Sequence, residues 1–134
     1  MIDIFLSYSS YDKFNINIMD DNLSPLSSKY NIWYYDQNSK ITMEEVLEKL
    51  NYTDLFILVV SNYSLNSKYV QKEIDHAIQL TKEGQIRGLY SILIDKSIDI
   101  SSDDRLPNYL KEKIFSVNSS VEISKIIEWI ARDY

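Results

Sequence analysis

The chain has 134 residues, of which 45% are hydrophobic and 25% charged, the composition of a folded globular domain. It contains no cysteine and one histidine, which excludes disulfide frameworks, thiolate zinc sites, cysteine nucleophiles and the usual histidine-rich zinc hydrolases. The net charge is −6, and no basic stripe is present, which argues against a nucleic-acid partner. We expect a single domain over 1–134 with no metal site.

No apolar run approaches the roughly 20 residues that a transmembrane helix needs. The sequence begins Met1-Ile2-Asp3, with neither a basic start nor a small-residue cleavage site, so no signal peptide is expected. These features predict a cytoplasmic protein without a membrane partner.

Apolar runs alternate with amphipathic segments along the chain. The apolar runs predict strands over 2–6, 30–35, 55–60, 89–94 and 113–117. The amphipathic segments predict helices over 13–24, 42–50 and 67–82 and a last helix from Ser119, with a polar irregular connection over 95–108. Capping boxes open two of these helices, at Thr42 with Glu45 and at Ser119 with Glu122, and Gly84 closes a third.

Alternation of strands and helices predicts crossover connections, and therefore a parallel sheet with helices on both faces. We expect a five-stranded α/β domain with the flavodoxin-like strand order 2-1-3-4-5. Ligands of such folds bind at the carboxyl ends of the strands, which directs attention to the loops after Tyr8, Tyr35 and Val60.

Several activities of related folds are excluded by what these loops contain. The two glycines, Gly84 and Gly88, do not follow the first strand, so a dinucleotide fingerprint and a phosphate loop are both absent. A phosphoacceptor receiver domain needs acids after the first strand, an aspartate ending the third and a lysine ending the fifth. The chain has Ser7-Tyr8-Ser9, Val60-Ser61 and Val117-Asn118 at these places.

Glu73 lies on the predicted helix 67–82, at the border between its apolar and its charged face. A carboxylate at this border can be partly desolvated and still reach a cleft beside the carboxyl end of the sheet. From spacing alone, however, a solvated surface residue is the more common interpretation of Glu73. The simpler interpretation of His76 is a residue at the surface. The simpler interpretation of Trp33-Tyr34-Tyr35 is a strand that packs on its neighbours.

Three segments resemble the conserved boxes of TIR (Toll/interleukin-1 receptor) domains. They are 3–9 followed by Asp12, the run 32–36, and the run 61–74 that ends in Glu73-Ile74. The boxes occur in the family's order and spacing. The resemblance implies a five-stranded flavodoxin-like fold over the whole chain. It also implies, as in many bacterial members, cleavage of NAD+ at the nicotinamide–ribose bond, with ADP-ribose or a cyclic ADP-ribose as a signal, including in antiphage defence.

The resemblance also assigns roles to residues. It implies that Glu73 is the catalytic residue and that NAD+ is the substrate. It implies no separate cofactor. The residues it implies for nucleotide binding are Tyr8, Ser9, Ser10, Asp36, Ser67 and Tyr69. Two positions depart from the common pattern: Tyr69 stands where tryptophan is usual, and 40–43 lack the usual proline-glycine.

Two other functions are open from the sequence. Many TIR domains are non-catalytic adaptors, and in that case the surface formed by 36–41 and 42–50 would make homotypic TIR–TIR contacts. Homotypic self-association is expected for an enzyme as well, with a downstream effector that senses the product. The third function is chemistry like that of nucleoside deoxyribosyltransferases, which would exchange bases without consuming NAD+.

Overall fold

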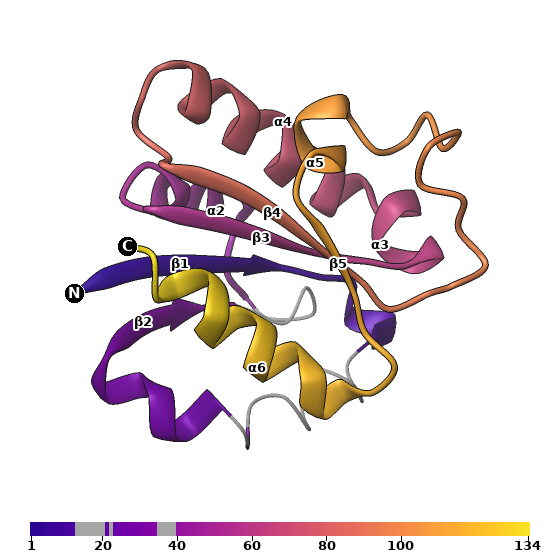
Figure 1. The fold of residues 1–134 in the computed structure, drawn as a ribbon. Helices are drawn as coiled ribbons and strands as arrows, with labels where there is room; N and C mark the ends of the chain where they lie inside the picture. Colours follow the sequence, from indigo (N-terminus) through magenta and orange to yellow (C-terminus); the bar gives the residue numbers. More distant parts are fainter. Residues whose placement is uncertain (13–20, 22, 35–39) are drawn as a thin grey trace.

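The computed structural model describes residues 1–12, 21, 23–34 and 40–134 (Figure 1). Within these residues the centre of the molecule is a parallel sheet in the order β2-β1-β3-β4-β5. Its strands are β1 (Ile2–Ser7), β2 (Tyr30–Trp33), β3 (Leu55–Val60), β4 (Gly88–Leu93) and β5 (Ile114–Ser116). The predicted flavodoxin-like strand order is therefore confirmed.

Helices cover both faces of the sheet, as Figure 1 shows. One face carries α2 (Met43–Leu50), α4 (Lys68–Lys82) and α5 (Asn108–Lys111), and the other carries α6 (Ser120–Ala131). The 3-10 helices are η1 (Ser10–Asp12) and η2 (Ser24–Ser28), and the short α3 (Asn62–Asn66) lies at the carboxyl end of β3.

Two apolar cores form because side chains of a strand point alternately to opposite faces. On β1, Ile4 and Leu6 belong to the core under α6, whereas Phe5 belongs to the core under α2 and α4. The residues of β3 divide in the same way, and all of them are buried. A strand covered on both faces has no need for polar alternation, which explains the continuous apolar run 55–60.

Most helix ends follow the expected capping chemistry. Thr42 Oγ1 accepts the backbone N–H of Glu45 at 3.2 Å, and Ser67 Oγ accepts that of Val70 at 3.2 Å. Gly84, with φ +82°, terminates α4 in the left-handed conformation that favours glycine.

The second predicted capping box is wrong. The Ser119 side chain makes no capping hydrogen bond, and Glu122 instead accepts the N–H of Asn118 at 3.1 Å. The prediction also omitted α3 and α5, because helices of four or five residues are too short to show a 3.6-residue period. Most of the predicted helix 13–24, and the predicted strand end at Tyr35, lie outside the described residues.

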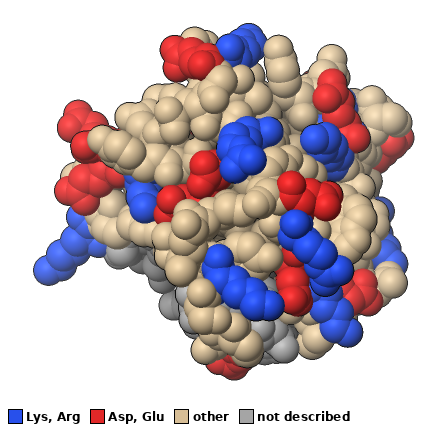
Figure 2. Space-filling view, turned by 60° about the vertical axis from the view of Figure 1, so that its left-hand side comes forward, with Lys and Arg blue, Asp and Glu red and all other residues tan. Residues whose placement is uncertain are grey.

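Both termini lie at the edge of the sheet where the strands begin, as Figure 1 shows, opposite the end that carries η1 and α3. The Tyr134 and Tyr90 hydroxyls are 2.6 Å apart and anchor the carboxyl terminus to β4. On the face shown in Figure 2, basic and acidic side chains are interspersed, with no continuous basic surface. Among the described helices, none combines the length and the apolar character required to cross a bilayer.

Candidate functional site

A buried hydrogen bond joins the end of β1 to α4. The hydroxyl of Ser7 donates to Glu73 Oε1 at 2.7 Å, and each residue is only 1% exposed. Glu73 is therefore more deeply buried than its border position on the helix predicted. The reason is that this flank of α4 packs against the end of β1, where the small Ser7 side chain leaves room for a carboxylate. Buried carboxylates are rare without such a partner, so the pair indicates a specialised position.

A cleft lies at the carboxyl ends of β1 and β3. Its volume is about 550 Å³, within the range of small-molecule sites. Two segments line it: residues 9–11, which follow β1, and residues from α3 and the start of α4 (Asn62, Tyr63, Asn66, Ser67, Lys68 and Tyr69). The same two segments lead into Ser7 and Glu73. Tyr69 lies one helical turn, roughly 6 Å along the axis, before Glu73.

The structure brings together four of the residues that the resemblance implies for binding. Ser9, Ser10, Ser67 and Tyr69 all line the cleft. The Ser9 hydroxyl accepts the N–H of Tyr11 at 3.2 Å and so shapes the turn after β1. Ser67 is the N-cap of α4, so its hydroxyl has a structural function in addition to its place in the cleft.

Tyr8, another of the predicted binding residues, does not line the cleft. Tyr8 belongs to the core under α6, where its ring meets that of Tyr34 edge to face at 6.2 Å. It therefore points to the face of the sheet opposite Glu73. Asp36 lies outside the described residues.

A second buried carboxylate connects the two walls of the cleft. The Ser61 hydroxyl donates to Asp12 Oδ2 at 2.6 Å, and burial raises the pKa of Asp12, although this hydrogen bond opposes the shift. Ser61 also opens α3, since its Oγ accepts the N–H of Ser64 at 3.0 Å while the Ser64 hydroxyl accepts the N–H of Ser61 at 2.9 Å. Asp12 thus ties η1 to the first turn of α3.

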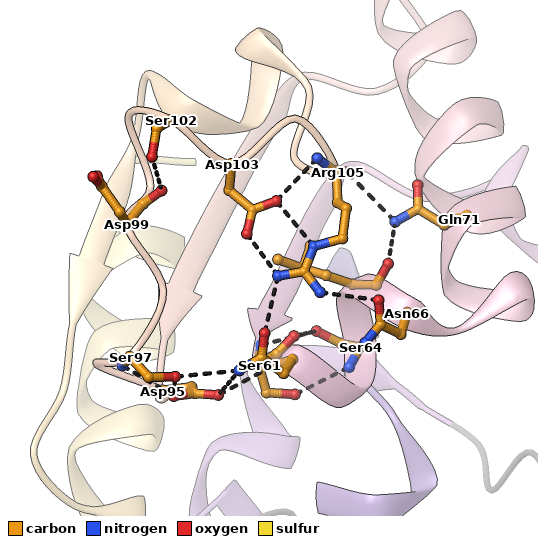
Figure 3. Close-up of polar contacts among 12 residues, drawn as sticks. Ser61, Ser64, Asn66, Gln71, Asp95, Ser97, Asp99, Ser102, Asp103 and Arg105 are labelled. Carbon is orange, nitrogen blue, oxygen red and sulfur yellow. Dashed lines mark hydrogen bonds and ion pairs between the residues drawn. The ribbon is translucent and has the colours of Figure 1, made fainter.

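Arg105, which sequence reasoning missed, holds α3 from the opposite side (Figure 3). Its guanidinium donates to the side-chain oxygens of Asn62 and Asn66, each at 2.9 Å, and pairs with Asp103 at 2.6 Å. The hydrogen bond with Arg105 lowers the pKa of Asp103 to about 2. No local pattern could reveal this contact, because Arg105 lies in the segment 95–108 that was expected to be irregular, and its partners are 39 and 43 positions away.

In the part of the chain that the structure describes, no group of three or more histidine, cysteine, aspartate or glutamate side chains is placed to hold a metal ion. The chemistry that these residues offer is that of two buried carboxyl groups, Glu73 and Asp12, beside hydroxyl, amide and aromatic groups.

Fold and site together define a flavodoxin-like α/β domain with its cleft at the carboxyl ends of the central strands. The family model of the TIR domain matches residues 4–122, so the chain belongs to the TIR domain family. A comparison with curated protein sequences gave no significant match.

Proposed function

We propose that this TIR domain is an NAD+ nucleosidase in which Glu73 is the catalytic carboxylate. TIR domains include enzymes that cleave NAD+ as well as signalling modules without activity. The observation that supports an enzyme here is the buried Ser7–Glu73 hydrogen bond, one helical turn from a cleft of suitable volume. If this position on α4 had only a structural role, an apolar residue would be more stable there, since burying a charge costs free energy.

One carboxylate suffices for this reaction. Nicotinamide carries a positive charge in NAD+, so the bond from C1′ of the ribose to the nicotinamide nitrogen breaks with its electron pair leaving on a neutral nicotinamide. The ribose becomes oxocarbenium-like, as in glycoside hydrolysis, and a nearby carboxylate stabilises that positive charge. Water then adds to C1′ and loses a proton to give ADP-ribose. Attack by the adenine of the same molecule gives a cyclic ADP-ribose instead.

The cleft residues supply the remaining contacts in this proposal. Tyr69 packs against the ribose or the nicotinamide, and Ser9, Ser10 and Ser67 hold the ribose or diphosphate. Tyr8 contributes through its packing on Tyr34, which fixes the start of the loop that carries Ser9 and Ser10. The role of Asp36 at the ribose is part of the same proposal.

Glu73 must become accessible to substrate before it can act in this reaction. Because Glu73 is 1% exposed, its carboxylate meets substrate only after neighbouring side chains have moved. TIR domains associate with other TIR domains, and such assembly is a suitable trigger. We place the reaction in the cytoplasm, in antiphage defence, with the product sensed by a downstream effector.

The decisive experiment is NAD+ consumption at high protein concentration, with products resolved by mass. Wild type is compared with Glu73→Gln, and with Asp75→Asn, which removes an exposed carboxylate from the same helix. Wild type and Asp75→Asn are expected to consume NAD+, and Glu73→Gln to be slower by at least about a hundredfold. Circular dichroism checks that Glu73→Gln is folded.

A wild-type rate in Glu73→Gln would show that Glu73 is not the catalytic residue. If no protein consumes NAD+ at any concentration, and none exchanges bases on deoxynucleosides, the second candidate applies: a non-catalytic TIR–TIR interaction module. One observation favours that candidate. A shallow groove of about 400 Å³, lined by Trp33, Ile41, Tyr52 and residues of α2, lies on the surface expected for homotypic contacts. Sedimentation of a Tyr52→Ala variant would test this groove.

A further inference from the structure

Two exposed tyrosines stack on each other in the cleft. Tyr11 is 80% exposed and Tyr63 is 57% exposed, yet their ring centroids are 5.2 Å apart and their planes differ by only 24°. Both line the cleft next to residues that lead to Ser7 and Glu73. Apolar ring faces presented to water in a concave place are typical of a binding surface.

The backbone on both sides of this pair is fixed by buried hydrogen bonds. Tyr11 directly precedes Asp12, which accepts the Ser61 hydroxyl at 2.6 Å, and Ser61 is the N-cap of the helix that carries Tyr63. Arg105 holds the same helix through Asn62 and Asn66. The rings are therefore preorganised, so that a ligand stacking on them loses less free energy to ordering.

Polar groups of a particular kind surround the two rings. Arg105 donates to the Asn66 side-chain oxygen, which turns the Asn66 NH₂ group away from Arg105. Ser10, Ser67 and Lys68 also line the cleft. Flat aromatic faces suit a planar base, whereas amide and hydroxyl groups with one cation suit its polar edge and an attached sugar phosphate.

We propose that the Tyr11–Tyr63 pair is the stacking platform for the purine base of a nucleotide. The identification of that nucleotide as NAD+ rests on the proposed function: the adenine end stacks on the tyrosines while the nicotinamide end extends past Tyr69 towards Glu73. The platform itself requires only that a purine nucleotide binds in the cleft.

The test uses AMP, which contains the purine base and a phosphate but no bond to nicotinamide. Calorimetry measures the affinity of wild type, Tyr11→Ala, Tyr63→Ala, Tyr11→Phe and Tyr63→Phe. Each alanine variant is expected to weaken AMP binding at least about fivefold, because it removes a stacking face, whereas each phenylalanine variant keeps it. Tyr109→Ala, which removes a 44%-exposed tyrosine packed on Lys82 outside the cleft, is expected to bind as wild type does. In saturation-transfer NMR the adenine H2 and H8 protons should receive the strongest signal.

The proposal is overturned if wild type does not bind AMP, if the alanine variants bind it as tightly as wild type, or if phenylalanine is as damaging as alanine. It is also overturned if the alanine variants lose only self-association, which would make the pair an interface between copies. Failure of the NAD+ nucleosidase proposal gives a different result: AMP binding depends on both rings while no NAD+ is consumed. Glu73-dependent turnover with an unchanged KM in the alanine variants would refute the platform alone.

Discussion

The hydroxyl of Ser7 donates to the carboxylate of Glu73 across 2.7 Å, joining residues that are 66 positions apart. This contact crosses from the sheet to α4 in the interior, so its loss leaves a buried acceptor without this donor. We expect Ser7→Ala to lower the free energy of unfolding by about 1.5–3 kcal/mol, the usual range for a hydrogen bond to a charged group. Urea denaturation measures the loss.

Ser124→Ala is the matched control for this measurement, since the Ser124 hydroxyl donates to the neutral carbonyl of Val121 at 2.9 Å. Its expected cost is about 1 kcal/mol. A double-mutant cycle of Ser7→Ala with Glu73→Gln then isolates the coupling of the pair. Equal losses for the two serine variants would show that the Ser7–Glu73 contact has no special strength.

Arg105→Lys tests how α3 is held. Lysine keeps the charge but cannot reproduce the planar set of donors that reaches Asn62, Asn66 and Asp103 together. We expect faster amide hydrogen exchange in α3 and a loss of stability of about 1–2 kcal/mol, while the exchange rates of β3 and β4 change only as far as global stability does. Unchanged exchange in α3 would mean that Ser61 and Asp12 are sufficient to hold the helix.

The contact between Asp103 and Arg105 is sensitive to acid. The pKa of Asp103 is lowered from 3.8 to about 2, chiefly by the hydrogen bond with Arg105. A carboxyl group whose pKa is lower in the folded state stabilises the fold above its unfolded pKa, and that stabilisation disappears as the pH falls through the folded value. The pair is partly in solvent, so its contribution is roughly 1 kcal/mol.

The measurement is the difference in unfolding free energy between wild type and Asp103→Asn as a function of pH. The difference should be fully present above about pH 4 and should close as the pH falls towards 2. Asp104→Asn controls for the removal of one charge from this loop. A difference that persists at the lowest pH would indicate that the asparagine perturbs the loop in some other way.

Gly88 at the start of β4 leaves room for two aromatic side chains. A Cβ atom there would lie 2.6 Å from the Tyr134 hydroxyl and 2.8 Å from Cε2 of Tyr90. Tyr134 can move aside, but the ring of Tyr90 is buried, so Gly88→Ala is expected to cost about 1–3 kcal/mol through overpacking. Thermal unfolding tests this, and a near-native melting temperature would show that the terminal residue absorbs the clash. Gly84→Ala is the comparison, because it adds strain at φ +82° without any clash.

The parts of the fold that follow from periodicity could be predicted from the sequence. The alternation of apolar runs and amphipathic segments predicted the parallel sheet, and the buried run 55–60 and the amphipathic helix of Glu73 form β3 and α4 as expected. Capping was predicted less well than periodicity: Thr42 accepts the N–H of Glu45 as expected, but Ser119 makes no capping hydrogen bond, and Glu122 accepts the N–H of Asn118 instead.

The candidate site was predictable only where it is local in sequence. Ser9, Ser10, Ser67 and Tyr69 lie in motifs, and the structure brings them into one cleft. The Ser7 partner of Glu73 could have been suspected as the one hydroxyl in an apolar strand, on the face that Phe5 shares. The contacts of Arg105 with Asn62 and Asn66 could not have been predicted, since they depend on how the loop after β4 folds back onto α3.

The placement of the termini has a practical meaning for experiments. Both ends of the chain lie at the amino-terminal edge of the sheet, whereas η1, α3 and the cleft lie at the carboxyl-terminal edge (Figure 1). A fluorescent protein, an affinity tag or an immobilising linker joined at either end would therefore extend away from the cleft. The density of surface-tethered protein can therefore be varied to test for self-association and for the proposed nucleotide binding without obstructing the cleft.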